Sequence, residues 1–593
     1  MSEASQPQLP AWVYKRDGRL VPFDADRLSQ ALFAAAEALG RPDAFLAREL
    51  TDGILHFLAR EHGSAIPTTA QIAELAATVV RELGQASLAQ AYAEGNRHRL
   101  RHTGPPSPRP AAAGTTGTTQ VAGSRMSFEF SLADSPEAVR QACLREYGLR
   151  AMFGRDLAAA HHDGLLTLSG LESAQQLAGC VFDPAGRGSL TSSKTGPTPP
   201  SGRSGVLVQA LLHTRRLAGN FLAIDGPEYA LTPFASARDL AKNSGELLAG
   251  LEAADLLAVI NLNAAQPPAW AEEQPEGPLF AEPRRSPSAH LHEYRGVLLE
   301  QLLRPPASSR VRFDWHLTEH DFSGEGAGAR LARLARLALD SALSFVFDRP
   351  GRPVALAEGL DRRCPGALQV VGLHLPRLLD MPGVRGAPEA FLQKIASLAR
   401  MAVSAGAQKR EYLRRHDRGR EQLAREFLLD RARLVVVPIG LDAAVRGLAG
   451  QGIAAGAKGL EMGQQIVASL LANLRQAAVP ANLDVVVDGT CASRAAADRG
   501  FALADADSVG WAALEQVAGL TPWDPSATPR DQLRAAGALH GVAEAGTAAV
   551  LLPPQATPEI DELLDLLAFA CKQTEIVRLR FLRVPDRQAQ LAW

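Results

Sequence analysis

The pattern of apolar and polar positions predicts a mostly helical segment at the start of the chain. After Asp24, apolar side chains recur at helical spacing on one face, namely at Leu28, Ala31, Leu32, Ala35 and Leu39. Thr68 and Gln71 have the spacing of a capping box, which opens a second helix with Ile72, Leu75, Ala76, Val79 and Leu83 facing inward. Gly84 interrupts this pattern. A third helix then carries Leu88, Ala91 and Tyr92 and leads into the basic cluster Arg97-His98-Arg99.

Farther along the chain, short apolar or β-branched runs alternate with helical patterns. The runs that predict strands are 165–168, 256–260, 368–373, 434–437, 483–487, 549–552 and 577–581. The segment from Pro388 to Leu428 predicts one long helix or a broken pair. Such alternation is typical of an α/β layer or barrel architecture. We therefore expect an α/β fold: a mostly helical N-terminal domain with a small β-hairpin, followed by an α/β barrel.

Length and local composition divide the chain into three parts. A chain of 593 residues is long enough for more than one domain. From His102 to Arg125 the residues are mostly Pro, Gly, Thr and Ala without periodicity, a composition typical of a flexible linker. We expect an N-terminal domain at residues 1–101, a linker at 102–130 and a second domain at 131–593.

Charge and cysteine usage narrow the functional class. The formal net charge is −2, so the composition indicates neither a nucleic-acid-binding nor a membrane-binding protein. No apolar run approaches the length of a membrane span and no signal segment opens the sequence, so we expect a cytoplasmic protein. The five cysteines lie far apart and form no Cys-x-x-Cys pair, which argues against a disulfide framework and a structural zinc site. No metal is predicted.

The segment from Trp12 to Asp24 predicts a compact hairpin with two basic side chains at its turn. The turn reads Lys15-Arg16-Asp17-Gly18. Lys and Arg supply charge-assisted donors and a tight turn adds backbone N–H groups, so this arrangement suits a triphosphate. Many surface hairpins also carry a lysine beside an Asp-Gly turn, so the fragment alone leaves both interpretations open. The chain has no phosphate loop of the Gly-x-x-x-x-Gly-Lys-Ser kind, which favours binding of ATP without hydrolysis.

Taken together, the hairpin, the helices, the break at Gly84 and the closing basic helix resemble the ATP-cone. This domain senses nucleotides in ribonucleotide reductases and in their transcriptional repressor. The resemblance covers residues 11 to about 100. It implies ATP or dATP as an effector. It also implies a nucleotide site lined by Val13, Lys15, Arg16, Gly18, Phe23, Asp24 and Arg27, and closed by Thr69 and Arg97.

The rest of the chain is similar to the large subunit of the anaerobic, glycyl-radical class of ribonucleoside-triphosphate reductase. The segments that carry the resemblance are 158–171, Gly179-Cys180-Val-Phe-Asp183, Arg363-Cys364-Pro-Gly, 370–378 and 437–450. In that family a glycyl radical oxidises a cysteine to a thiyl radical, and a second cysteine assists reduction of the ribose. The resemblance implies that Cys364 is the thiyl residue and Cys180 its partner, on neighbouring strands inside a reductase-like barrel. The alternative is that both are buried, inert cysteines.

The C-terminal region departs from this family. The family ends in a paired-cysteine zinc module and a loop with the radical glycine, whereas this sequence has no glycine after Gly546 and no Cys-x-x-Cys. We therefore expect that the chain cannot run glycyl-radical chemistry on its own.

Three hypotheses remain. The chain is a divergent reductase whose radical glycine is lost or supplied by a separate subunit, or a non-catalytic nucleotide sensor that regulates a reductase or another partner. The third, a repressor-like regulator, is disfavoured because no basic patch accompanies the cone. We also expect a homo-oligomer.

Overall fold

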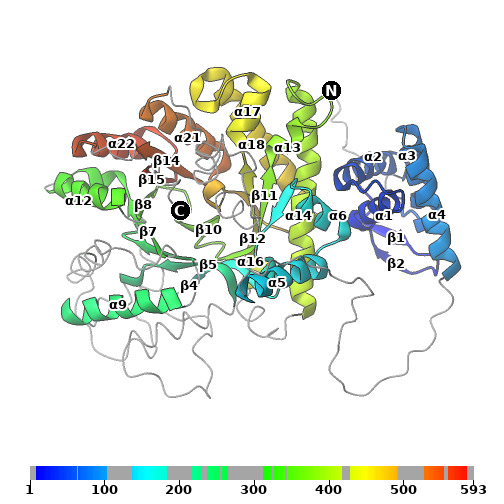
Figure 1. The fold of residues 1–593 in the computed structure, drawn as a ribbon, viewed down its shortest axis with the longest axis horizontal. Coiled ribbons are helices and arrows are strands. Elements are labelled where there is room, and N and C mark those ends of the chain that lie inside the picture. Colours follow the sequence, from blue (N-terminus) through cyan, green and yellow to red (C-terminus); the bar gives the residue numbers. More distant parts are fainter. Residues whose placement is uncertain are drawn as a thin grey trace, which may run out of the picture. The chain divides into compact units, whose positions relative to one another are not determined.

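The computed structural model describes residues 9–62, 65–102, 136–182, 217–228, 237–253, 257–264, 295, 311–323, 326–340, 343–416, 428–491, 527–552 and 558–583. The chain divides into two compact units, Met1–His162 and Asp163–Trp593. Figure 1 shows the elements of both units in sequence colours. The expected linker at 102–130 lies almost wholly outside the described residues.

In the residues that the structure describes, the first unit has a two-stranded hairpin and six helices. Strands β1 (Trp12–Tyr14) and β2 (Leu20–Pro22) pair antiparallel, with Val13 opposite Val21. The helices are α1 (Ala25–Ala38), α2 (Ala44–His62), α3 (Thr69–Glu82), α4 (Ala86–His102), α5 (Pro136–Met152) and α6 (Arg155–His162). Asp24 caps α1, and the Thr68–Gln71 capping box that the sequence predicts opens α3. Helices α5 and α6, which we assigned to the second domain from the sequence, group with this unit.

The second unit contains a mixed sheet built from parallel halves. Strands β4 (Leu177–Phe182), β5 (Ala218–Asp225), β6 (Leu257–Leu262), β7 (Val311–Leu317) and β8 (Leu343–Phe347) run parallel in that order. Strands β11 (Gly366–His374), β12 (Ala432–Ile439) and β13 (Val485–Val487) are parallel to one another, as are β14 (Thr547–Leu552) and β15 (Arg578–Arg583). Antiparallel pairing joins β11 to β4 and β15 to β8, and β3 (Leu166–Leu168) adds to β11.

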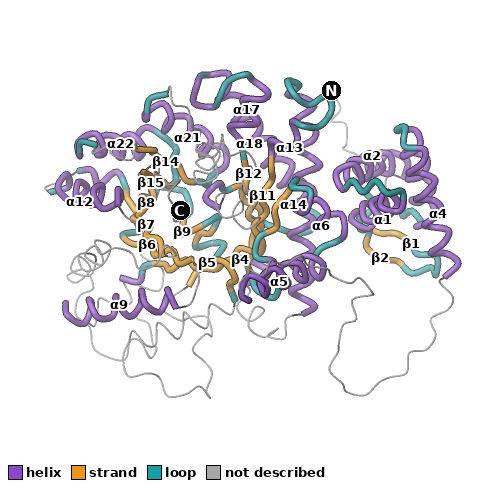
Figure 2. The backbone as a smooth tube through the Cα atoms, in the orientation of Figure 1, coloured by secondary structure: helices purple, strands orange, loops and turns teal. Residues whose placement is uncertain are grey.

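Among the described residues, the edge strands β13 and β14 meet through side chains. The hydroxyl groups of Thr490 and Thr547 lie 2.9 Å apart, the first directly after β13 and the second at the start of β14. The guanidinium of Arg578 on β15 donates to the same Thr490 hydroxyl at 3.4 Å. The sheet therefore closes on itself as a barrel-like layer, and Figure 2 shows its strands with helices around them.

Helices cover the outer face of this sheet. They include α9 (Ala237–Ala253), α12 (Ala327–Asp340), α13 (Leu375–Leu379), α14 (Pro388–His416), α16 (Leu428–Arg431), α17 (Leu441–Ala449), α18 (Ala457–Ala478), α21 (Pro529–Ala543) and α22 (Ile560–Gln573). Short 3-10 helices lie at Leu171–Ser173, Glu319–Phe322, Ile453–Ala455 and Gly489–Cys491. A large apolar core packs α9, α12, α21 and α22 against the strands β4 to β8, β14 and β15.

A second hairpin fills the inner side of the barrel. Strands β9 (Ala355–Ala357) and β10 (Leu360–Asp361) pair antiparallel between β8 and β11, and Glu358 and Gly359 form the tip. Leu356, Ala357 and Leu360 pack against apolar residues of both halves of the sheet, among them Val259 and Val435. Gly359 has φ +65°, and a Cβ there would lie 2.7 Å from a Val486 methyl. The tip therefore needs glycine for both its backbone conformation and its space.

Candidate functional site

The turn of the first hairpin presents two basic side chains. The Lys15 N–H donates to the Arg19 carbonyl at 2.9 Å, and Gly18 adopts φ +77°. Asp17 is held by the Arg19 guanidinium at 2.7 Å, which lowers the pKa of that carboxyl. Neither Lys15 nor Arg16 forms a side-chain hydrogen bond or ion pair with any residue that the structure describes. Both cations are therefore available to an anionic ligand.

Apolar packing and backbone contacts fix this hairpin to the helices. Val13 is buried against Leu58 of α2 and Ile72 of α3, with Phe23 partly buried beside them. The Tyr14 N–H donates to the Pro67 carbonyl at 3.0 Å, next to the Thr68 cap. The turn is therefore held in place although it is exposed.

The other residues implied by the ATP-cone resemblance lie on these same elements. Asp24 accepts from the Asp26 N–H at 3.1 Å and from the Arg27 guanidinium at 3.2 Å, so it is both helix cap and anchor of Arg27. Thr69 opens α3, and Arg97 lies exposed on α4. Their contact with a nucleotide stays a prediction.

A buried ion pair ties α6 to the cone helices within the first unit. The Arg48 guanidinium on α2 donates to Asp26 on α1 at 2.9 Å and lies 3.4 Å from Asp156 on α6. The Ser29 hydroxyl also donates to Asp156, at 3.0 Å. Side-chain exposure is 4% for Arg48 and 1% for Asp156. Because Asp26 lies two residues after the Asp24 cap, the expected nucleotide site and α6 share one polar network.

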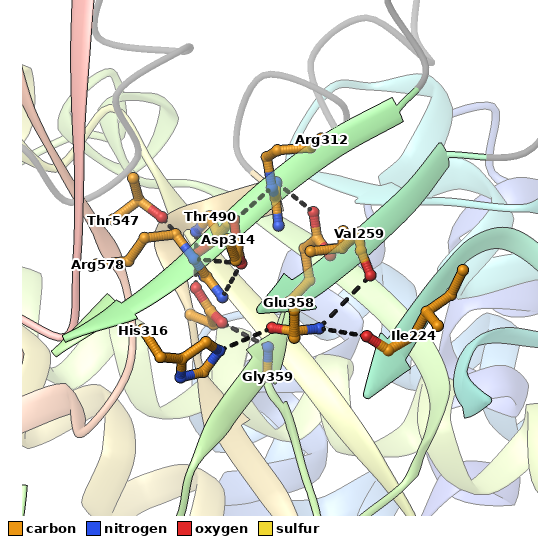
Figure 3. A network of polar contacts seen from close by, with 12 residues as sticks. Ile224, Val259, Arg312, Asp314, His316, Glu358, Gly359, Thr490, Thr547 and Arg578 are labelled. Carbon is orange, nitrogen blue, oxygen red and sulfur yellow. Dashed lines mark hydrogen bonds and ion pairs between the residues drawn. The ribbon is translucent and has the colours of Figure 1, made fainter. Parts of the chain in front are cut away.

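The inner face of the barrel carries a second polar network, drawn in Figure 3. The Arg578 guanidinium donates to Asp314 on β7 at 2.9 Å. The Arg312 guanidinium donates to Asp314 at 3.3 Å and to Glu358 at the hairpin tip at 3.1 Å. The Gly359 N–H donates to the Asp488 carboxylate. Charged groups from β7, β15 and the hairpin therefore meet at the centre of the barrel.

Next to this network lies a buried histidine. His316 on β7 contacts the Asp348 carboxylate at 2.9 Å and the Asn261 side chain at 3.1 Å. Burial opposes the charged imidazolium, but the neighbouring carboxylates, Asp348 foremost, raise the pKa of His316 above its ordinary value. The sequence offered no signal for this cluster, because its members come from distant strands.

The structure gives the two predicted catalytic cysteines different surroundings. Cys180 pairs in register with Leu222 on β5, and both belong to the core between the sheet and the outer helices. Cys364 lies in the connection between β10 and β11, where its thiol donates to Asp484 at 3.1 Å. Burial and this hydrogen bond raise the pKa of Cys364 to about 11. Only the backbone brings the two segments together, since Cys180 is opposite Gly366.

A cavity of about 720 Å³ opens beside the inner hairpin. Its lining includes Gly359 of the tip, Arg578 of β15 and Asp488 after β13. Six arginines and four carboxylates line it in total.

Within the described residues no group of three or more metal-ligating side chains gathers. In the same part of the chain, no helix is long and apolar enough to cross a membrane.

Comparison with known sequences gives two findings. Residues 12–99 match the family model of the ATP cone domain. No curated protein matches the chain by sequence. The N-terminal segment is thus an ATP-cone, as its residues predicted.

Solved structures resemble the chain over most of its length. A structure entitled "Anaerobic ribonucleotide reductase" superposes with a TM-score of 0.55 at 13% identity, covering 75% of this chain and 78% of that one. The anaerobic ribonucleotide reductase from Thermotoga maritima in complex with dATP and CTP superposes with a TM-score of 0.55 at 12% identity, covering 75% and 83%. The same enzyme with citrate in the active site also gives 0.55, at 12% identity, covering 75% and 89%. The chain therefore has the α/β fold of anaerobic ribonucleotide reductases.

Proposed function

We propose that this chain is a nucleotide-regulated protein of the anaerobic reductase type, whose ATP-cone binds ATP or dATP as an effector. The observation that carries the proposal is the pair Lys15 and Arg16, held on a fixed hairpin with no partner in the described part of the chain. Charge-assisted donors of this kind bind phosphate oxygens strongly, at about 1.5–3 kcal/mol per contact. The cone offers binding without the machinery of hydrolysis.

In this proposal the nucleotide lies against the hairpin and the start of α1. Lys15, Arg16 and the turn at Gly18 take the phosphates, and Asp24 with Arg27 borders the site. Val13 and Phe23 supply its apolar floor, because both pack at the base of the hairpin. Thr69 and Arg97 close it. Nucleotide control of this fold is supported by the anaerobic ribonucleotide reductase from Thermotoga maritima, which binds dATP in its specificity site and forms a complex with dATP and CTP.

The barrel is proposed to act in ribonucleotide reduction or its regulation, without running glycyl-radical chemistry alone. Residues 547–593 contain no glycine to hold the radical. A thiyl radical also needs a thiol aimed at the reacting atoms, whereas the thiol of the thiyl candidate Cys364 donates to Asp484 in the connection between β10 and β11. Its expected partner Cys180 belongs to the core on the helix side of the sheet. A partner that supplies the glycine, and assembly of the chain as a homo-oligomer, are part of the proposal.

One observation favours the second candidate, a nucleotide sensor without catalysis. At the tip of the inner hairpin the chain has Ala357, Glu358 and Gly359, and the Glu358 carboxylate is held in an ion pair with Arg312. A sensor keeps the cone and the fold but needs no open reaction centre. Both candidates share the nucleotide site, and reductase activity with added partner subunits separates them.

The test is a calorimetric titration of the full chain with ATP and with dATP. In the double variant Lys15→Ala, Arg16→Ala the dissociation constant should rise at least about tenfold, because both phosphate contacts are lost. Arg41→Ala is the matched control, since Arg41 follows the far end of α1, about 20 Å along the helix from Asp24. An unchanged affinity in the double variant, or an equal loss in the control, removes the assignment of the site.

A further inference from the structure

Two arginine side chains of strand β15 point into the barrel. Leu579 and Phe581 belong to the core beneath the outer helices, so the alternating Arg578 and Arg580 point to the opposite, inner face. Arg578 reaches Asp314 across that face, which confirms the direction. Both side chains come from a short segment that the sequence shows as Arg-Leu-Arg. Two guanidinium groups therefore share the interior with Arg312 of β7.

Arg580 differs from the other two arginines in its partners. Arg578 is paired with Asp314, and Arg312 with Asp314 and Glu358. Arg580 forms no hydrogen bond or ion pair with any described residue, and its Nε is buried without an acceptor. Burial and the nearby guanidinium groups of Arg312 and Arg578 lower the pKa of Arg580 to about 10. The group is thus still a cation at neutral pH.

A second buried donor lies directly opposite Arg580. In the antiparallel pair of β8 and β15, Ser344 is the register partner of Arg580, so the two Cβ atoms are about 4.5–5.5 Å apart. The Ser344 hydroxyl is buried and has no hydrogen-bond partner among the described residues. Two adjacent buried donor groups, Arg580 Nε and Ser344 Oγ, thus have no hydrogen-bond acceptor in the described part of the chain. A buried polar group without a partner is costly, which points to an acceptor that binds there.

The charges of this cluster favour a negative acceptor. Arg312 and Arg578 pair with the carboxylates of Asp314 and Glu358, and Asp488 accepts from the Gly359 N–H, so no described carboxylate pairs with Arg580. Water can accept a hydrogen bond but does not neutralise the charge. An oxyanion does both, since its oxygens accept from guanidinium and hydroxyl groups together.

The cavity beside the inner hairpin reaches this cluster at Arg578. Its lining includes Arg578, which lies two residues from Arg580 on the same face of β15. The Cα atoms of two residues that are two positions apart on a strand are separated by about 7 Å, so one small anion can contact both side chains. The six arginines against four carboxylates in the lining also make the approach cationic.

We infer that the barrel holds an anion site, in which Arg580 and Ser344 bind a carboxylate or phosphate group beside Arg578 and Arg312. The site is separate from the cone and does not depend on the nucleotide proposal. The same oxyanion chemistry is offered by a free anion or by the phosphate of a larger molecule. A variant whose cone no longer binds nucleotide distinguishes the two sources, because binding of a free anion or of a larger phosphate-containing molecule can then be assigned to the barrel.

The experiment measures binding of three probes to the full chain by calorimetry: inorganic phosphate, citrate, and ATP in the Lys15→Ala, Arg16→Ala background. At least one probe should bind, and Arg580→Met should weaken it at least about tenfold. Ser344→Ala should weaken it by a smaller factor, about threefold to tenfold, because one neutral donor is lost. Binding of phosphate or citrate identifies a free anion, and binding of ATP alone identifies a phosphate on a larger molecule.

Thermal unfolding provides a readout that does not require a known ligand. Without added anion, Arg580→Met should unfold at the same or a higher temperature than the wild type, because it removes a buried charge that no described carboxylate pairs with. Arg330→Met is the control, since it removes the same charge from the exposed surface of α12. A large loss of stability in Arg580→Met without anion, or no probe whose binding depends on Arg580, overturns the inference. Loss of cone binding in Lys15→Ala, Arg16→Ala leaves this result unaffected, so the two proposals fail separately.

Discussion

The buried pair Arg48–Asp156 allows a quantitative prediction for the variant Arg48→Met. The substitution keeps most of the side-chain volume but leaves the Asp156 carboxylate, 1% exposed, without its guanidinium partner and next to the neutral Ser29 hydroxyl at 3.0 Å. Breaking a buried ion pair by removing one partner costs about 3–5 kcal/mol. We therefore expect the contact of α6 with α1 and α2 to open about 10² to several times 10³ more often than in the wild type.

The pH dependence of this loss follows from Asp156. Burial raises the pKa of Asp156 above its ordinary value even beside Arg48. Without the guanidinium the folded-state pKa rises further, and the protonated, neutral carboxyl is tolerated in the core. The deficit of Arg48→Met should accordingly be largest at alkaline pH and should shrink as the pH falls through the raised pKa of Asp156.

Amide hydrogen exchange is the suitable assay, because a chain of two units does not unfold as a single two-state system. Peptides covering α1, α2 and α6 should lose protection in Arg48→Met and recover most of it in Arg48→Met, Asp156→Asn, which carries no buried charge. Arg155→Ala is the control, since the Arg155–Glu37 pair is exposed and contributes roughly 0–1 kcal/mol. Equal protection in Arg48→Met and the control, or no recovery in the double variant, would refute the reasoning.

Three further predictions concern the second unit. Because the pKa of Cys364 is raised to about 11, alkylation of its thiol should be slow at neutral pH and should accelerate as the pH rises toward that value. The buried Cys180 and Cys571 should react only after unfolding. Fast labelling of Cys364 at neutral pH would contradict this prediction. The pairing of His316 with Asp348 should contribute its whole stabilising free energy below about pH 6.5, and this contribution should be lost as the pH rises through the raised pKa of His316 in the folded protein. Hydrogen-exchange protection of β7 should therefore fall with rising pH in the wild type but not in Asp348→Asn. Given an activating radical enzyme, reductant, ATP and ribonucleoside triphosphates, the chain alone should give no glycyl-radical doublet in electron paramagnetic resonance and no deoxyribonucleotide; either signal would show that the radical site was misplaced.

The cone could be predicted from sequence because its determinants are local. The Asp24 cap, the Thr68–Gln71 capping box and the apolar stripes each lie within a few turns of one another, so the pattern alone specifies the elements. The family model match at residues 12–99 agrees with the predicted extent. The strands β6, β11, β12 and β13 were likewise visible as β-branched runs.

The interior of the barrel could not be predicted in the same way. Strand β7 carries Arg312, Asp314 and His316 on its inner face, so it lacks an apolar run and was missed as a strand. The partners of Arg312 and Asp314 lie on the inner hairpin and β15, 46 and 264 positions away in sequence. Those of His316 lie on β6 and after β8. Cys180 and Cys364 were chosen by motif resemblance, which carries no information about the face of the sheet to which a side chain points. Side-chain direction is set by strand register, here Cys180 with Leu222.

The central claim is that the cone at the first hairpin is where the protein senses nucleotide. Hydrogen exchange of the full chain with and without saturating dATP tests it directly, because it locates the ligand without assuming its contacts. The account predicts protection of peptides covering residues 11–27 and 68–75, and loss of that protection in Lys15→Ala, Arg16→Ala. Protection confined to the second unit, or protection of the hairpin that survives the double substitution, would contradict it.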